Sequence, residues 1–310
     1  MTKTPLRQCV LVVGSVALDN VKTPFGEVKD ALGGAAVYSS IAASYFAPVR
    51  LVGVVGSDFP KKHVRFLSSR GIDISGVKSM PGKTFRWSGY YGFDLNQAHT
   101  LDTRLNVFEH FRPEIPEEYR NSKYVFLANI DPELQLQVLD QIKSPKLAVC
   151  DTMNFWIENK RDSLLEVLKR VNVVFMNDAE ARQLCGTYSL IKAARQIREL
   201  GPPVVIIKKG EHGAVMVSND AYFAAPCYPV EEVVDPTGAG DSFAGGFIGY
   251  VASTDDISEG NLRKATIYGS TMASFNVQDF SLRRLASLTL DEIVTRYCEF
   301  KQIAYFEAIG

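Results

Sequence analysis

The sequence lacks the cysteine and histidine patterns of two common kinds of protein. Its 310 residues include five cysteines, an odd number, with no C-x-x-C pair: Cys9, Cys150, Cys185, Cys227 and Cys298. Closely paired cysteines would indicate a disulfide framework or a zinc site. The four histidines show no metal-ligand spacing either. We therefore expect a protein of a reducing compartment, the cytoplasm, with neither feature.

Long apolar runs and an excess of one charge are also absent. No apolar segment reaches 18 residues, and Met1–Arg7 leads directly into a strand-like run at Cys9–Val13. This pattern predicts neither export nor membrane anchoring. Lys and Arg total 34 against 35 Asp and Glu, which gives no reason to expect nucleic acid or an acidic membrane as a partner. The expected partner is a small molecule.

Three familiar catalytic motifs are missing. The sequence has no G-x-x-x-x-G-K-[ST] loop and no G-x-S-x-G elbow. Gly238-Ala239-Gly240 continues with Asp-Ser-Phe, where a dinucleotide-binding loop would place its third glycine. An NAD-dependent oxidoreductase is therefore disfavoured, and absence of NAD binding would exclude it.

The sequence does show a regular alternation of short β-rich runs and helical stretches. With 46% hydrophobic and 22% charged residues, it has the composition of an ordinary globular enzyme. The expected strands are Val10–Val13, Val49–Val54, Tyr124–Ala128, Leu147–Cys150, Val171–Met176 and Val204–Lys208. The expected helices are Ala35–Phe46, Pro60–Arg70, Glu133–Lys143, Arg161–Arg170, Asp178–Cys185 and Leu190–Leu200. Apolar strands alternating with helices predict a doubly wound, mainly parallel α/β sheet with catalysis at its carboxyl edge.

One segment interrupts this alternation. From Lys83 to about Val107, polar and bulky residues alternate around the turn-prone Asp94–Gln97, which predicts a hairpin outside the main sheet. Its aromatic residues are Phe85, Trp87, Tyr90, Tyr91 and Phe93. By alternation, Phe85, Trp87 and Tyr91 share one face and Tyr90 lies on the other.

The most informative stretch runs from Asp235 to Gly246. Val233 and Val234 end a β-rich run, the small residues Gly238-Ala239-Gly240 follow, and a helical apolar pattern begins after Asp241. Unpaired N–H groups at a helix N-terminus form an anion site. A carboxylate in the first turn could act there as a base, or could simply complement the helix dipole.

This stretch resembles the D-x-x-G-A-G-D-x-F signature of the PfkB, or ribokinase-like, carbohydrate and nucleoside kinases. The resemblance implies a single ribokinase-like kinase domain over residues 1–310, with a small β lid formed by segments of about 16–32 and 83–108. It also implies ATP and Mg²⁺ as cofactors, with Asp241 as general base and the Gly238, Ala239 and Gly240 backbone at the transferred phosphate.

The same resemblance implies an acceptor site. Asp19, after the first strand, and Gly33-Gly34, before the first long helix, match the elements that hold acceptor hydroxyls, although alone they indicate a turn and a helix entry. Tyr38 stands where many sugar kinases of the family carry Asn. The expected acceptor-binding residues are Asp19, Gly33, Gly34, Tyr38, Trp87 and Asn129.

A nucleotide site is implied as well. Asn177 and Glu180 match an N-x-x-E element that orders the waters of Mg²⁺, although the local pattern also fits a helix cap. Lys208 replaces the usual Thr of a T-x-G-x-x-G turn. The expected nucleotide-binding residues are Asn177, Glu180, Lys208, Gly210, Gly213 and Asn276, with Asp235 a candidate ligand of a monovalent cation such as K⁺.

These features predict an ATP-dependent kinase that phosphorylates a primary hydroxymethyl group. The lid aromatics and Tyr38 favour an adenosine-like ribonucleoside, because planar side chains can stack on a base. The alternatives are a kinase of ribose, fructose or a related sugar, and a catalytically silent nucleotide or sugar sensor, which the intact Asp241 disfavours. Instead of stacking on a base, these aromatic side chains could form cross-strand pairs within the hairpin or a lid-to-lid contact in a homodimer.

Overall fold

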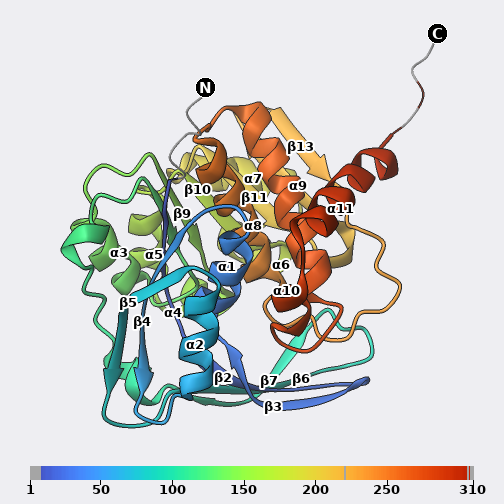
Figure 1. The fold of residues 1–310 in the computed structure, drawn as a ribbon. Helices are drawn as coiled ribbons and strands as arrows, with labels where there is room; N and C mark the ends of the chain where they lie inside the picture. The colour runs from blue at the N-terminus through green and yellow to red at the C-terminus, as the bar shows by residue number, and fades with distance from the viewer. Residues whose placement is uncertain (1–7, 220, 306, 308–310) are drawn as a thin grey trace, which may run out of the picture.

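The computed structural model describes residues 8–219, 221–305 and 307. The prediction from Met1–Arg7, that the chain is neither exported nor anchored in a membrane, concerns a segment outside the described residues. Two sheets are present, of nine and four strands. Figure 1 shows the smaller sheet below the main body, at one edge of the larger one.

The main sheet is parallel except at one edge. Its strands, in order across the sheet, are β13 (Ala221–Ala225), β12 (Ala214–Ser218), β11 (Val204–Lys208), β10 (Val173–Asn177), β9 (Leu147–Asp151), β8 (Tyr124–Leu127), β1 (Val10–Val13), β4 (Val49–Gly56) and β5 (Ile72–Met80). β12 and β13 are antiparallel to their neighbours. The parallel strands are almost wholly apolar because helices cover both faces.

Helices bury the two faces of this sheet separately. Along β1, Val10 and Val12 join one core cluster with α1, α8 and α9, whereas Leu11 and Val13 join another with α3, α5, α6 and α7. The helices are α1 (Ala35–Ser44), α2 (Lys61–Ser69), α3 (Pro132–Gln141), α4 (Asn154–Asn159), α5 (Arg161–Leu168), α6 (Asp178–Cys185), α7 (Leu190–Glu199), α8 (Ala239–Thr254), α9 (Glu259–Asn276), α10 (Arg283–Ser287) and α11 (Leu290–Ile303). Short 3₁₀ turns are η1 (Asn106–His110), η2 (Glu117–Tyr119) and η3 (Gly210–His212).

The small sheet is assembled from two distant parts of the chain. Its order is β3 (Gly26–Gly33), β2 (Ala17–Thr23), β6 (Phe85–Tyr91) and β7 (Ala98–Arg104). The β6–β7 hairpin lies in the segment predicted to leave the main sheet, and β2 pairs with β6 in parallel. The predicted lid segments therefore build one sheet, while the single-domain division of residues 1–310 stays a prediction.

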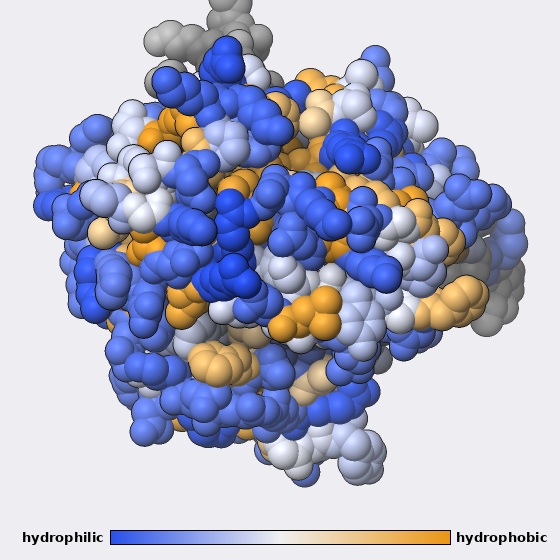
Figure 2. Space-filling view, turned by 90° about the horizontal axis from the view of Figure 1, so that it is seen from below, coloured by the Kyte–Doolittle hydropathy of each residue, from blue (hydrophilic) through white to orange (hydrophobic). Residues whose placement is uncertain are grey.

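The outer face of the small sheet is mixed in character. Figure 2, which views the molecule from below, shows separate hydrophobic patches among mostly hydrophilic residues. Phe25 is 60% exposed, Leu101 66% and Phe93 90%. Exposed apolar side chains of this kind are compatible with a contact to a second copy of the chain. The homodimer stays a prediction.

Candidate active site

The N-terminus of α8 has the geometry of an anion site. Gly238 is the N-cap at φ 77°, and no side chain caps this end. A Cβ at Gly238 would lie 2.4 Å from the Tyr38 ring, so a larger residue would not fit. Among the described residues, the N–H groups of Gly240 and Asp241 have no hydrogen-bond partner. These donors, with the positive end of the helix dipole, favour a bound anion.

Two buried side chains hold the loop that leads into α8. Asp235 is fully buried, and its carboxylate accepts from Thr237 N at 2.9 Å and from Ser281 N at 3.1 Å. Asn276 is also fully buried; its amide donates to Thr237 O at 2.7 Å and accepts from the Ser242 hydroxyl at 3.1 Å. Asn276 therefore holds the loop from inside, and its predicted nucleotide-binding role stays a prediction.

Asp241 lies half-buried in the first turn of α8, near two charged groups of the main sheet. Burial and, less strongly, the Asp151 carboxylate raise its pKa from 3.8 to about 7, although the Lys208 ammonium opposes the shift. A carboxylate with a pKa near neutrality is well matched to accept a proton from a hydroxyl. The assignment of Asp241 as the base stays a prediction.

Asp151 belongs to the site, although the sequence analysis did not identify it. It ends β9, is 4% exposed, and its Oδ2 accepts from Lys208 Nζ at 2.7 Å. Burial lowers the pKa of Lys208, but Asp151, Glu180 and Asp241 raise it, and the net result is a pKa above the usual range. The only sequence signal for Asp151 was its position just after the predicted strand Leu147–Cys150.

Asn177 and Glu180 form a capping box at the start of α6. Asn177 Oδ1 accepts from Glu180 N at 2.8 Å, while Glu180 accepts from Asn177 N and from the Asn177 amide, each at 2.7 Å. The two residues therefore form the helix cap that the local pattern predicts. Their role in ordering the waters of Mg²⁺ stays a prediction. Burial, with Asp151 adding to it, raises the pKa of Glu180 to about 7.

The acceptor-side residues Asp19, Gly33 and Gly34 meet where the small sheet joins α1. Asp19 is 5% exposed; burial raises its pKa to about 7, opposed by a hydrogen bond from the Gly34 backbone. A Cβ at Gly33 would lie 1.8 Å from Asp19 Oδ2, so the carboxylate occupies the space that a side chain would fill. This arrangement fixes two carboxylate oxygens that can accept from hydroxyl donors.

Two lid aromatics point to the same region. Trp87 is in register with Asp19 across β2 and β6, so both side chains lie on one face of the small sheet. The Thr237 hydroxyl donates to Tyr91 Oη at 3.3 Å, which joins β6 to the loop before α8. Tyr90 instead stacks on His99, and Phe85 stacks on Phe108.

The remaining predicted residues have the following places in the structure. Tyr38 is 1% exposed and its ring packs beneath Gly238, so it supports the loop before α8; its acceptor-binding role stays a prediction. Asn129 Oδ1 accepts from Trp156 Nε1 at 2.9 Å, which orients its amide. Gly210 and Gly213 form the turn after β11, where Asn96 of the small sheet's hairpin donates to Glu211 at 3.3 Å.

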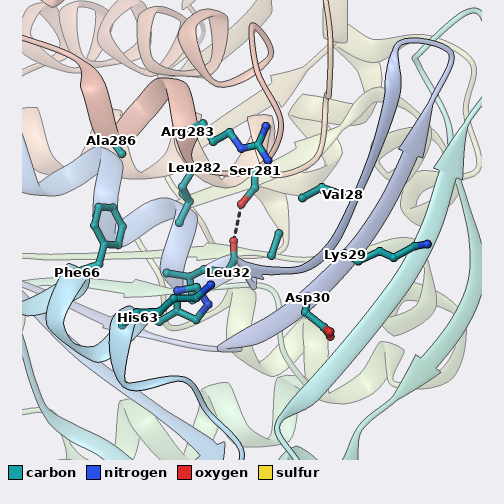
Figure 3. Close-up of a pocket in the computed structure, with 12 residues that line it drawn as sticks. Val28, Lys29, Asp30, Leu32, His63, Phe66, Ser281, Leu282, Arg283 and Ala286 are labelled. Carbon is teal, nitrogen blue, oxygen red and sulfur yellow. Dashed lines mark hydrogen bonds between the residues drawn. The ribbon is translucent and has the colours of Figure 1, made fainter.

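A pocket of about 320 Å³ lies between β3, α2 and residues 281–286. Figure 3 shows Ser281 donating to Leu32 at its edge, with the charged ends of Lys29 and Arg283 pointing away from His63. Its lining includes none of the predicted site residues. The pocket therefore does not define the candidate site.

The arrangement brings together an uncapped helix N-terminus, the carboxylate of Asp241 in its first turn, and the carboxylate of Asp19 from the small sheet. An α/β fold with these elements defines a phosphotransferase of the ribokinase-like class. The family model of the pfkB family carbohydrate kinases matches residues 7–287, and the chain belongs to this family.

Relatives of this chain include a cytidine kinase and a nucleoside kinase. A cytidine kinase of Thermococcus kodakarensis is 37% identical over 244 residues, which cover 77% of this chain and 87% of the relative. A nucleoside kinase of Methanocaldococcus jannaschii is 27% identical over 253 residues, or 78% of this chain and 79% of the relative.

Solved structures confirm the fold. The M. jannaschii nucleoside kinase aligns with a TM-score of 0.77 at 24% identity, over 94% of this chain and 98% of its own. The aminoimidazole riboside kinase of Salmonella enterica, complexed with aminoimidazole riboside and an ATP analogue, aligns with a TM-score of 0.75 at 18% identity, over 94% of this chain and 100% of its own. No helix in the described part of the chain is both long and apolar enough to span a membrane.

Proposed function

We propose that this protein is an ATP-dependent ribonucleoside kinase that phosphorylates the primary hydroxymethyl group of its acceptor. The observation that carries the proposal is the placement of Asp241 beside the unpaired N–H groups at the start of α8. Relatives named cytidine kinase and nucleoside kinase support a nucleoside acceptor.

In the proposed reaction, Asp19 accepts hydrogen bonds from acceptor hydroxyls and so directs the hydroxymethyl group toward Asp241. The hydroxymethyl oxygen forms a bond to the γ-phosphorus of ATP, and the bond from that phosphorus to the β–γ bridging oxygen breaks. The hydroxyl proton passes to Asp241, and ADP departs with the bridging oxygen. The Gly240 and Asp241 N–H groups stabilise the charge on the transferred phosphoryl group.

The residues present fit a nucleotide with Mg²⁺. Among the described residues, no group of three or more His, Cys, Asp or Glu side chains could enclose a metal ion. Mg²⁺ is commonly held by one or two carboxylates, waters and substrate phosphates, and Glu180 would hold such waters. When bound, the ion would neutralise phosphate charge. Lys208, Gly210 and Gly213 would flank the nucleotide at the end of β11.

Three further parts of the proposal concern conditions and partners. Asp235 would help a monovalent cation such as K⁺ to order the loop before α8, because its buried carboxylate already joins Thr237 of this loop to Ser281. A homodimer through the small sheet and a cytoplasmic location complete the proposal.

Acceptor choice is the part to test first. Trp87, on the same face as Asp19, would stack on the base, which favours the predicted adenosine-like nucleoside over a free sugar. The test is ADP release with adenosine, cytidine, inosine, ribose and fructose under identical conditions. A preference of more than about tenfold for a free sugar would make this chain a sugar kinase. ATP binding without transfer to any acceptor would favour the sensor.

A further inference from the structure

The ammonium group of Lys208 is held by a buried carboxylate. Lys208 Nζ donates to Asp151 Oδ2 at 2.7 Å, and Asp151 Oδ1 accepts from Thr152 N at 3.0 Å. Both carboxylate oxygens therefore have defined donors, and the carboxylate cannot turn without losing one. A buried ion pair of this kind is weak evidence for stability, because desolvation offsets much of the attraction. We therefore ask which group the ion pair positions.

The strand register places this pair across β10. Asp151 is in register with Phe175 on one side, and Lys208 is in register with Asn177 on the other. Lys208 Nζ lies 5.7 Å from the centroid of the Phe175 ring, and that ring packs edge-on against Phe243 of α8 at 5.6 Å. The ion pair therefore lies on the face of the main sheet that α8 covers.

The ammonium lies close to the first turn of α8. A Cβ at Gly240 would be 3.0 Å from Lys208 Nζ, so the absence of a side chain there leaves space beside the ammonium. A cation beside a helix N-terminus is repelled by the helix dipole. The dipole alone would disfavour the ammonium here, whereas Asp151 holds it in place. An anion bound at this helix end would be attracted to the ammonium and to the helix N-terminus at once.

We propose that Asp151 is a positioning residue that fixes Lys208 as a catalytic cation beside the N-terminus of α8. There the ammonium contacts the phosphoryl group during transfer, while the bond to the acceptor oxygen forms and the bond to the bridging oxygen breaks. Lys208 donates hydrogen bonds and transfers no proton, so charge stabilisation is its whole contribution. This inference rests on the proposed kinase function and adds Asp151, which acts through Lys208.

A double-mutant cycle tests this coupling. Lys208→Met should lower kcat by roughly 100-fold, the usual effect of losing one preorganised charge-stabilising group. Asp151→Asn should lower kcat by roughly 10- to 100-fold, as misplacement of a catalytic group does, with a smaller change in KM for ATP. The double variant should be no slower than Lys208→Met, and Lys208→Arg should retain more activity than Lys208→Met. Asp255→Asn is the matched control, because Asp255 also accepts from a lysine, Lys146, at 2.8 Å.

The cycle uses whichever acceptor the parent protein phosphorylates best. If that acceptor is a sugar, the nucleoside proposal fails while the cycle still decides the role of Asp151. Additive losses in the double variant would overturn the positioning role, as would a lower Tm for Asp151→Asn with kcat unchanged. If Asp151→Asn does not fold, the double variant, which removes both buried charges, and Lys208→Arg are still measured. A kcat near that of the parent in Lys208→Met or in the double variant would overturn the catalytic role of Lys208.

Discussion

Asp241 should give the reaction an acid limb centred near neutral pH. Burial raises its pKa from 3.8 to about 7, with Asp151 adding to the shift and Lys208 opposing it. Only the ionised carboxylate can accept the hydroxyl proton, so activity is present above this pKa and is lost as pH falls through it. For a pKa of about 7, the ionised fraction is about nine-tenths at pH 8 and about one-tenth at pH 6. We therefore expect kcat/KM to fall by roughly tenfold over this interval.

The assay is ADP release with limiting ATP and saturating acceptor, at constant ionic strength. Saturation matters because burial also raises the pKa of Asp19, on β2, to about 7, and Asp241 contributes to that shift. A bound acceptor removes the Asp19 titration from the profile. Asp241→Asn should lower turnover by about 10²–10⁴ and remove the Asp241 titration from the limb, leaving that of Glu180, whose pKa is also raised to about 7. A flat parent profile, or an Asn variant within about tenfold of the parent, would refute the assignment.

Two variants should move the limb in opposite directions. Lys208→Met removes a cation that lowers the pKa of Asp241, so the limb should move to higher pH. Asp151→Asn removes an anion that raises this pKa, so the limb should move to lower pH. Shifts of the same sign would contradict the arrangement of these three groups.

Four further outcomes are expected. Asp241→Asn should raise the Tm of the ligand-free protein by a few degrees, measured by calorimetry, because it replaces a desolvated carboxylate; a lower Tm would contradict this. Gly238→Ala should lower Tm by several degrees and abolish ATP binding, because φ is 77° and the new Cβ would lie 2.4 Å from the Tyr38 ring. An ATP titration like that of the parent would show that the loop tolerates a side chain. Trp87→Ala should lower kcat/KM for a nucleoside by roughly tenfold and leave ribose unaffected, and unchanged nucleoside selectivity would remove Trp87 from the base site. Raising K⁺ against a large organic cation at fixed ionic strength should increase kcat through the loop that Asp235 holds, and a flat response would exclude the cation.

Elements with strong local signals could be predicted closely from sequence. The helix Asp178–Cys185 and the strands Val10–Val13 and Val204–Lys208 have the predicted bounds. At Asp178 the Asn177 cap fixes the start, and Gly186 at φ 61° ends the helix. Where no such signal exists, the apolar periodicity continues beyond the end of the helix: the helix expected to reach Phe46 ends at Ser44.

Residues whose roles depend on tertiary contacts could not be predicted. Asp151 and Lys208 are 57 positions apart, and only strand order and register bring them together. Resemblance predicts Tyr38 at the acceptor and Asn276 at the nucleotide, whereas their burial depends on how α1 and α9 pack against the loop before α8. A family pattern gives a residue's neighbourhood, whereas the direction of its side chain depends on packing.

The tie between the small sheet and the end of the chain has a consequence for biosynthesis. Ser281 donates to Leu32 at the end of β3, across 249 positions, and its N–H also donates to Asp235. Contacts this distant in sequence form late, because the intervening chain must be ordered first. A ribosome-bound chain that has emerged only as far as α8 has its base and its acceptor carboxylate but lacks this tie. Competence to bind both substrates should therefore appear only when translation is nearly complete.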